Sequence, residues 1–491
     1  MMDKVNLCKM LEIGVALTKE KNYDKLLSLI ISVSMDITSS DAGTLYMYEK
    51  NALHFKIMKN NTLGLNNGEN GDVSEFPPVP LEEGNVCAYS AINRKIVNIP
   101  DVYNYDKFDF SGPRNYDPIT GYRTKSMLVI PLENHENELI GVLQLINSLD
   151  CDGNVIPFNK EYEYVLMAIA SQAAISVSNM KYNQEVKDLL HSIVSVFATA
   201  VDARTPYNSC HTSNVSKYVG ILIDYINEKY SNGEIDIFFD ENRREQLILA
   251  TMLHDLGKLI IPLEIMNKET RLGAQLDTIL NRFDHLISLW YIEFLESRIS
   301  RDEWLTEKQF LTDAKQYVKD INTSICLSDD DVAYVNNLAN KTYPNINGDT
   351  KFYITPQEKE CLLIIKGTLT NDERYIMETH VDFTEKLLSK INMTENYKNI
   401  SVWASSHHEY LDGTGYPKHL TAENIPFEAR ILAVADIYEA LTAVDRPYKK
   451  SVSSDDALNV LFSMANEGKL DKYIVNLFND AIKNRHFECE G

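Results

Sequence analysis

The stretch LHDLGK, at residues 253–258, decides the fold expected for the C-terminal half of this chain. It lies in a helical context, where neighbouring side chains diverge by about 100°. His254 and Asp255 can therefore reach different sides of a metal cluster, with the aspartate bridging two ions. Lys258 follows His254 by four residues, so it is expected on the same helix face, where its ammonium would meet a phosphate oxygen. Such a site needs further ligands from other helices.

Histidines and an aspartate in contexts that also predict helix supply those ligands. The candidate metal ligands are His211, His254, Asp255, His380, His407, His408 and Asp436. Imidazole and carboxylate together suit iron, manganese, cobalt or zinc. Seven nitrogen and oxygen ligands are too many for one zinc ion, but they suit two six-coordinate ions with open positions. Two metals roughly 3.5–4 Å apart are a recurrent device for displacement at phosphorus.

Two further motifs surround these ligands, HHEYLDGTGYP at 407–417 and ADIYEALTAVDRPYKK at 435–450. Glycines and a proline directly after the histidine pair predict a rigid loop facing a substrate. Together with LHDLGK, the motifs resemble the HD-GYP subfamily of HD-domain phosphohydrolases. These are bacterial, metal-dependent phosphodiesterases of cyclic dinucleotides, chiefly cyclic di-GMP. The resemblance covers residues 190–270 and 367–465, and it implies an all-α domain.

Carried over position by position, the resemblance implies a role for each matching residue. The seven candidate ligands would hold two divalent ions, iron or manganese, with Asp255 as the bridge and as a catalytic residue beside Lys258. Substrate contacts are implied for Lys258, Gly415, Tyr416, Arg446 and Lys449. The implied reaction opens cyclic di-GMP to a linear dinucleotide, and whether it continues to GMP stays open.

The chain departs from the subfamily in two places. Some members carry a glutamate one helical turn before the first ligand histidine, which adds a third metal. Tyr207 stands at that position, so two metals are expected. Residues 272–365 separate two segments that nearly adjoin in compact members. A helical insertion is expected there, as a lid, a dimer contact or a partner surface.

The first 180 residues predict an α/β sensor domain with an antiparallel sheet. LLSLIISVSMDI has helical spacing, whereas AGTLYMYE, ALHFKIM, SMLVIPL and ELIGVLQLIN are typical of strands. DAGTLYMY, GYRTKSMLVIPL, GVLQLIN and ASQAAISVSN resemble the GAF domain, which often senses small molecules. Cyclic-nucleotide-binding members share an Asn-Lys-Phe-Asp-Glu set. This chain keeps Asn147, Phe158 and Glu163 but has Ser148 and Tyr162 at the other two positions, so a different small-molecule ligand, or a ligand-free dimer scaffold, is expected.

A long helical signal begins at Glu161 and carries two apolar stripes. The first is Tyr162, Leu166, Ile169, Ala173, Ser176 and Met180, and the second is Val186, Leu190, Ile193, Phe197 and Ala200. Both have coiled-coil-like spacing but are short. They fit either a linker helix with one buried face or a parallel dimer seam. The expected α+β organisation is a GAF-like domain at 1–180, a linker helix at 181–200 and an HD-GYP domain at 201–491.

Composition limits where the protein works and what it binds. The 491 residues, about three structural units long, include 48 basic and 71 acidic residues and carry a formal net charge of -23. Such an acidic chain is a poor ligand for nucleic-acid polymers. No apolar run reaches the ~18–20 residues of a membrane span, and the N-terminus lacks signal-peptide grading. Seven scattered cysteines predict reduced thiols, so a cytoplasmic protein is expected.

Several partners and two alternatives stay open at this point. The expected partners are a cyclic dinucleotide, a second copy of the chain and a diguanylate cyclase. One alternative is a hydrolase of another cyclic dinucleotide, such as a GMP–AMP hybrid, or of a nucleotide. The other is a degenerate domain that only binds cyclic dinucleotides or proteins. Loss of a metal ligand would mark that second case, and the sequence keeps all seven.

Overall fold

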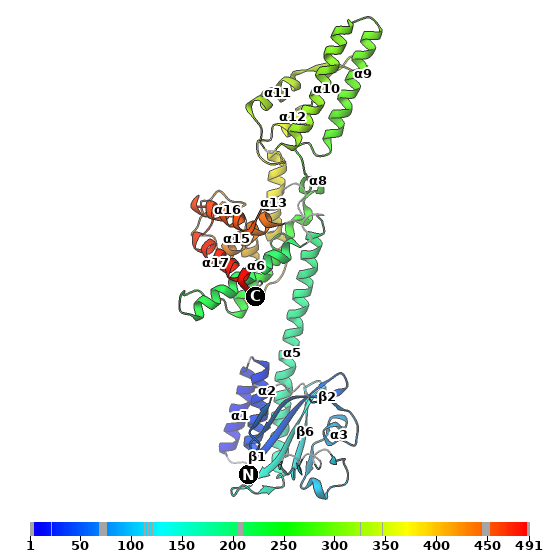
Figure 1. Cartoon of the computed structure of the whole chain (residues 1–491). Helices are drawn as coiled ribbons and strands as arrows, with labels where there is room; N and C mark the ends of the chain where they lie inside the picture. The colour runs from blue at the N-terminus through cyan, green and yellow to red at the C-terminus, as the bar shows by residue number, and fades with distance from the viewer. Residues whose placement is uncertain are drawn as a thin grey trace. The chain divides into compact units, whose positions relative to one another are not determined.

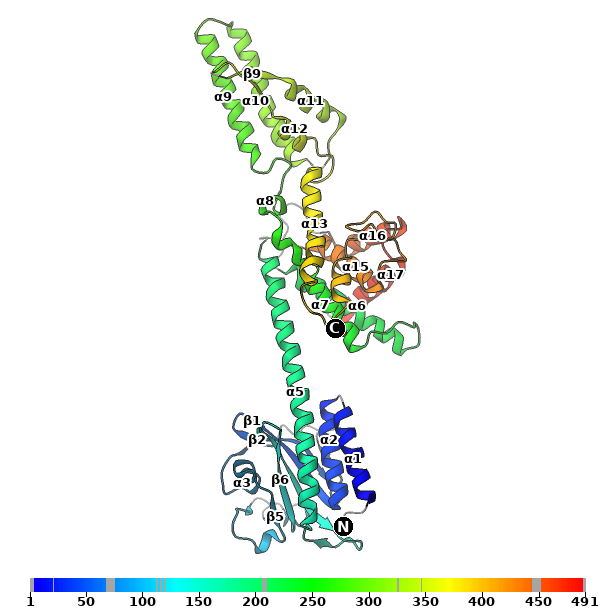
Figure 2. The same cartoon turned by 180° about the vertical axis from the view of Figure 1, so that it is seen from behind.

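The computed structural model describes residues 4–20, 22–67, 76–111, 114, 117–118, 121–204, 210–324, 326–345, 347–443 and 452–488. Tyr207, Arg446 and Lys449, for which the sequence predicts roles, lie outside these residues. The chain forms two compact units, Met1–Leu189 and Leu190–Gly491, and the boundary falls within helix α5 (Glu161–Asp202) (Figures 1 and 2). Among the described helices, none combines the length and the apolar character that crossing a bilayer requires.

The first unit is built on one antiparallel sheet, as the strand patterns predict. Its strands run in the order β3-β2-β1-β7-β6-β5. Short strands β4 (Val79–Pro80) and β8 (Val155–Ile156) pair with β2 and β7. The other elements are α1 (Lys4–Lys19), α2 (Tyr23–Thr38), β1 (Ser40–Glu49), β2 (Ala52–Asn60), β3 (Leu65–Asn67), α3 (Val86–Asn93), β5 (Val97–Ile99), β6 (Met127–Glu133) and β7 (Leu139–Leu149).

Alternation along the strands gives this sheet two different faces. Leu45 and Met47 join a core with α2 and the first part of α5, while Tyr46 lies in a second cluster beneath α3. Figures 1 and 2 show the long helices on one face of the sheet and α3 on the other. In α5, Leu166 and Ala173 are fully buried in the first of these cores. The first apolar stripe is therefore explained by packing within its own unit.

The second unit is a bundle of helices around one apolar core. Small side chains of α15 form the centre of this core, with Ala433, Val434 and Ala435 all buried. Its elements are α6 (His211–Ser231), α7 (Glu241–Leu253), the 3-10 helix η2 (Leu256–Ile260), α8 (Leu263–Met266), α13 (Asn371–Leu388), α14 (Ile400–Ala404), α15 (Phe427–Thr442), α16 (Ser454–Asn466) and α17 (Lys472–Glu488).

The stretch 272–365 forms its own cluster of elements with a separate core. Helices α9 (Gln275–Leu295), α10 (Arg301–Thr323), α11 (Asp329–Asn340) and α12 (Pro356–Leu362) enclose buried apolar residues that include Phe283 and Leu311. The sequence predicts a helical insertion, and the structure adds a two-stranded sheet of β9 (Thr342–Pro344) and β10 (Thr350–Phe352). Helices α9 and α10 lie side by side (Figure 1), and both contribute apolar residues to this core.

Candidate metal centre

Five structural segments bring the predicted ligands together. His211 begins α6, His254 follows α7, and His380 lies in α13. The pair His407 and His408 follows the short helix α14, and Asp436 lies in the middle of α15. Among these seven side chains all but His408 are buried, and Asp255 is 4% exposed. The residues form three sets, each with ligand atoms within 4.8 Å of one another, namely His380–His407–His408, His211–His254–Asp436 and His254–Asp255–His407.

The helical context expected for LHDLGK is wrong in one respect. Helix α7 ends at Leu253, and a 3-10 turn begins at Leu256. The reason is the close approach of α13, because a Cβ atom on Gly257 would lie 1.8 Å from the carbonyl oxygen of His380. Thr384 of α13 accepts the Gly257 N–H at 2.8 Å and donates its hydroxyl to the His254 carbonyl at 3.0 Å. The break therefore brings Asp255 against α13.

Lys258 reaches the cluster through Asp255. Its Nζ atom lies 2.6 Å from Oδ2 of Asp255, three residues earlier. The helical spacing predicts instead that Lys258 returns to the face of His254, which would require an unbroken helix. The 3-10 turn replaces that arrangement by an ammonium at the rim, since the Lys258 side chain is 22% exposed.

Backbone carbonyls orient three of the imidazoles. The Nδ1 atoms of His254, His380 and His407 lie 2.6–2.7 Å from the carbonyl oxygens of Thr251, Met377 and Ala404, each three residues earlier. A carbonyl can only accept, so each Nδ1 carries a proton, and Nε2 is the atom that offers a lone pair when the ring is neutral. These three Nε2 atoms, and that of His211, are buried without a hydrogen bond in the described structure. Such orphaned acceptors are the arrangement that divalent metal ligation satisfies.

A carboxylate orients the fourth imidazole. Oε2 of Glu439 lies 2.5 Å from Nδ1 of His211, and its other oxygen accepts a longer bond from Asn214 at 3.4 Å. Glu439 is 3% exposed. The sequence reasoning missed this residue. The sequence feature that points to Glu439 is its position three residues after Asp436, which puts both acidic side chains on one face of α15.

The two oxygens of Asp255 face different histidines. Oδ2 lies 3.4 Å from Nε2 of His211 and 3.3 Å from Nε2 of His254, while Oδ1 lies 3.5 Å from Nε2 of His380. Asp436 joins the first side, with Oδ1 3.3 Å from Nε2 of His211. Nitrogen and oxygen donors on both sides of one carboxylate fit two hard or borderline divalent ions that share it.

Burial and charge divide the histidines into two groups. Burial lowers the pKa of His380 to about 4 and of His408 to about 3, so both imidazoles are neutral at pH 7. Burial also acts to lower the pKa of His254, but Asp255 and Asp436 outweigh it and raise this pKa to about 9. Burial acts to raise the pKa of Asp255, but the neighbouring His254 and Lys258 outweigh it and hold this pKa well below the usual range. Binding of a metal ion by His254, beside Asp255 and Asp436, would therefore release a proton from His254.

The GYP loop borders this cluster. A Cβ atom on Gly415 would lie 2.3 Å from the backbone nitrogen of Tyr410, so the loop closes only around glycine. The buried carboxylate of Glu409 accepts the N–H groups of Lys418 and Leu420 at 2.7 and 2.8 Å, which fixes the far side of the loop. Tyr416 then lies with its ring centroid 4.8 Å from that of His408.

Known protein families match both halves of the chain. Residues 22–177 match the GAF domain, and residues 352–474 match the HD domain. These matches confirm both resemblances at the level of the two domains. Among solved structures, the GAF domain of an Acinetobacter phosphoenolpyruvate-protein phosphotransferase is 15% identical and covers 37% of this chain and 97% of its own, with a TM-score of 0.30. A GAF domain/HD domain protein from Geobacter sulfurreducens is 14% identical and covers 34% and 98%, with a TM-score of 0.25.

Several curated proteins that resemble part of this chain are named as phosphodiesterases. The cyclic di-GMP phosphodiesterase response regulator RpfG of Xanthomonas campestris is 40% identical over 111 residues, 23% of this chain and 28% of its own length. The 3'3'-cGAMP-specific phosphodiesterase 1 of Vibrio cholerae is 32% identical over 123 residues, 25% and 27%. A cyclic di-GMP phosphodiesterase of Thermotoga maritima is 35% identical over 109 residues, 22% and 28%. The matched part thus spans about a quarter of this chain and of each relative.

Proposed function

We propose that this chain, which carries a GAF domain and an HD domain, is a metal-dependent phosphodiesterase that opens cyclic di-GMP to a linear dinucleotide. The observation that carries the proposal is the convergence of four orphaned imidazole Nε2 atoms around the two oxygens of Asp255. The similarity to proteins named cyclic di-GMP phosphodiesterases supports the substrate. We also propose the organisation 1–180, 181–200 and 201–491, and a cytoplasmic location, which the scattered cysteines favour.

The residues divide the chemistry between them. Two divalent ions, iron or manganese, would supply Lewis acidity and activate water when bound. The seven ligands would hold them, with Asp255 shared. Lys258 is bonded to Asp255 at 2.6 Å, so its ammonium stays at the rim, where it can orient a phosphate oxygen and offset charge that develops there. Tyr416 and the closed loop at Gly415 form a wall for the substrate beside His408. Arg446 and Lys449 are proposed as substrate contacts on the resemblance alone.

A second candidate substrate is 3'3'-cGAMP, because one similar protein is named as specific for it. Purified full-length protein, loaded anaerobically with Fe(II) or Mn(II), should be assayed with both dinucleotides and the products separated by chromatography. Faster turnover of cyclic di-GMP supports the proposal, and faster turnover of 3'3'-cGAMP supports the second candidate. Absence of hydrolysis by protein with a full metal complement would leave the binding-only alternative. Asp255→Ala is the inactive control.

We further propose that two copies pair along α5. Tyr182, Val186, Leu189, Ile193 and Val196 follow one another at 4-3-4-3 spacing, and each is between 39% and 67% exposed. This is the register of a parallel coiled-coil seam. The opposite face, with Val194 and Val201, packs into the helical core, as does Leu190 of the predicted second stripe. Leu189→Lys should convert a dimer to a monomer in light scattering, whereas exposed Leu263→Lys should not. A monomeric unaltered protein contradicts the pairing.

A further inference from the structure

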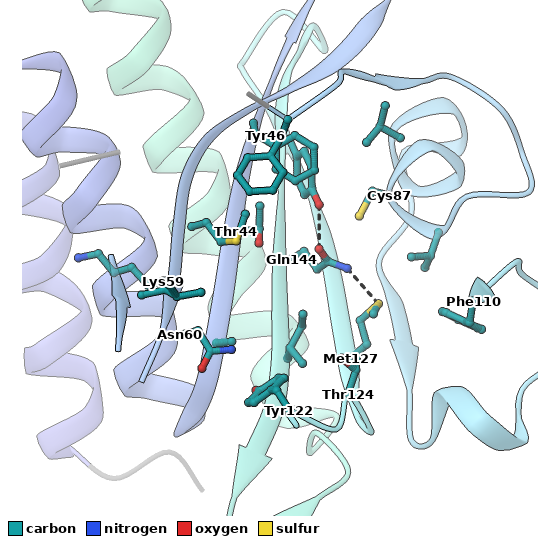
Figure 3. Close-up of a pocket in the computed structure, with 18 of the residues that line it drawn as sticks. Thr44, Tyr46, Lys59, Asn60, Cys87, Phe110, Tyr122, Thr124, Met127 and Gln144 are labelled. Atoms are coloured by element: carbon teal, nitrogen blue, oxygen red, sulfur yellow. Dashed lines mark hydrogen bonds between the residues drawn. The ribbon is translucent and has the colours of Figure 1, made fainter. Parts of the chain in front are cut away.

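The GAF domain contains a cavity of about 430 Å³ between its sheet and α3 (Figure 3). That volume falls in the range of small-molecule sites. One wall is the face of the sheet that carries Thr44, Tyr46 and Gln144, and the other includes Cys87 at the start of α3 and Phe110. The cavity lies within a single compact unit, so its shape depends on that unit alone.

The charged groups that line the cavity are already engaged elsewhere. Among the described lining residues the one cation is Lys59, and its ammonium bonds to the hydroxyls of Ser28 and Ser32 on α2, away from the cavity (Figure 3). Asp117 is buried and accepts three hydrogen bonds, from the hydroxyl of Tyr103 and from the backbone and hydroxyl of Thr124. Asp109, which also lines the cavity, is exposed and accepts the N–H of Ser111 at 2.8 Å. An anionic ligand would thus meet two carboxylates and, among the described lining residues, no cation directed into the cavity, which is costly.

The start of α3 offers no alternative site for an anion. The side chain of Asn85 accepts the N–H groups of Cys87 and Ala88 at 2.9 and 3.2 Å, so the helix is already capped by a neutral amide. Burial raises the pKa of the Cys87 thiol to about 12, so this thiol is uncharged at neutral pH. A cationic ligand is not required either, because Asp117 already accepts three hydrogen bonds and the exposed Asp109 accepts the N–H of Ser111.

One polar group in the cavity lacks a good partner. Oε1 of Gln144 accepts the hydroxyl of Tyr46 at 3.0 Å, which turns its amide nitrogen toward the sulfur of Met127 at 3.2 Å (Figure 3). A thioether is a weak acceptor, and a buried amide gains from a stronger one. Gln144 is 9% exposed, so little of its surface is open to water. An aromatic and aliphatic wall surrounds it, including Phe55 and Ile146.

We propose that this cavity binds an uncharged, largely apolar small molecule whose carbonyl or similar acceptor meets the amide of Gln144. The described lining therefore disfavours cyclic nucleotides and other phosphate-bearing effectors in this cavity. It is consistent with the contacts of Asn147, one of the three residues of the cyclic-nucleotide set that this chain keeps. Here Asn147 bonds the backbone of Lys125 and Arg123 at 2.8 Å each and ties two strand ends together. Regulation of phosphodiesterase activity by this ligand rests on the proposed function, whereas binding of the ligand to the cavity does not.

Three probes of one shape and different charge test the class of ligand. Naphthalene-2-carboxamide, 2-naphthoate and 2-naphthylmethylammonium should be titrated calorimetrically into the full-length protein at pH 7. The carboxamide should bind at least about tenfold more tightly than either ion, because each ion would lose hydration without a partner. Equal or tighter binding of an ion, or no binding of the carboxamide, would overturn the proposal. Phosphodiesterase activity does not enter this measurement, so failure of the proposed function is detected separately.

Substitution of the amide tests its role. Gln144→Leu should weaken carboxamide binding about 3–10-fold, the effect of one hydrogen bond, while binding of naphthalene itself stays unchanged. Tyr46→Phe, which removes the hydroxyl that orients Gln144, should weaken the carboxamide less. The matched control is Gln184→Leu on α5, an exposed glutamine that bonds to Asp188 and does not line the cavity. Unchanged carboxamide binding by the folded Gln144→Leu protein would overturn the assignment.

Discussion

Glu439 holds Nδ1 of His211 at 2.5 Å, whereas backbone carbonyls hold Nδ1 of His254, His380 and His407. A buried carboxylate makes its imidazole more basic than a carbonyl does, so His211 should be the strongest nitrogen donor of the cluster. The same helix supplies Asp436, one turn away. Helix α15 therefore provides both a candidate ligand and the group that orients another candidate ligand.

Glu439→Gln should weaken metal binding while leaving the fold intact. The amide keeps the shape of the side chain but loses the charge that orients and polarises His211. Loss of such a partner usually costs 10–100-fold in affinity. Metal retained against a competing chelator, measured by elemental analysis, reports this effect without an activity assay. Glu428→Gln on the same helix removes the pair with Arg243 and should retain metal. Equal metal retention by both variants would contradict the role of Glu439.

Asp255→Ala should abolish hydrolysis and lower the metal content. Both oxygens of Asp255 face histidines of different sets, so no other described carboxylate can replace the shared ligand without moving. The measurement is metal per chain in protein purified without chelator, together with turnover. Stripping the unaltered protein with chelator should give the same inactive state, and adding back metal should restore only the unaltered protein. Normal activity and full metal in the variant would refute the assignment.

Lys258→Met should separate metal binding from catalysis. An ammonium cannot ligate a metal, so the metals should remain. Loss of one electrostatic stabiliser typically lowers turnover about 10²–10³-fold. Methionine keeps most of the apolar stem of the lysine, and its thioether adds no charge. If metal content falls together with turnover, Lys258 serves mainly to hold Asp255, to which it is bonded at 2.6 Å.

The sequence motifs predicted which residues meet at the candidate metal centre better than they predicted the backbone geometry around those residues. The sequence predicts the seven candidate ligands because their order and spacing are unusual, and the structure brings these side chains together. It misplaces Lys258 because the break after Leu253 depends on α13, which lies over a hundred residues away. Glu439 escaped notice for the same reason, since its partner His211 comes from another helix.

The apolar stripes of α5 show the same limit. The spacing of Leu166 and Ala173 fits a dimer seam and an intrachain core equally well, and only the sheet beside them decides in favour of the core. The antiparallel sheet itself was predictable, because alternation along each strand is local. The two-stranded sheet at β9 and β10 was not, since three-residue strands carry too little pattern.

The ion pair between Arg282 and Glu358 predicts how the stability of the insertion depends on pH. Burial acts to raise the pKa of Glu358, but hydrogen bonds from Arg282 at 2.7 and 2.8 Å outweigh it and lower this pKa below 4.5. A carboxyl whose pKa falls on folding contributes stability above its unfolded pKa and loses it as the pH falls through the folded pKa. Glu358→Gln should therefore lower the melting temperature at pH 7, and the difference should narrow below pH 4.5. Glu293→Gln in the exposed pair with Arg298 should have little effect at either pH. A difference that grows on acidification would contradict this.

Two glycine substitutions distinguish a close contact from ordinary helix propensity. A Cβ atom on Gly257 would lie 1.8 Å from the His380 carbonyl oxygen and 2.8 Å from the backbone nitrogen of Thr384, so Gly257→Ala must push α13 away from η2. This should lower both the melting temperature and metal retention, because His380 moves with α13 while Asp255 does not. Gly220 lies within α6, and its nearest neighbour would be the end of the Arg244 side chain at 3.9 Å. Gly220→Ala should instead stabilise the protein by about 0.5–1 kcal/mol through helix propensity. Thermal unfolding and elemental analysis of the two variants, side by side, give the test. If Gly257→Ala behaves like Gly220→Ala in both measurements, then the contact between η2 and α13 does not position the metal ligands.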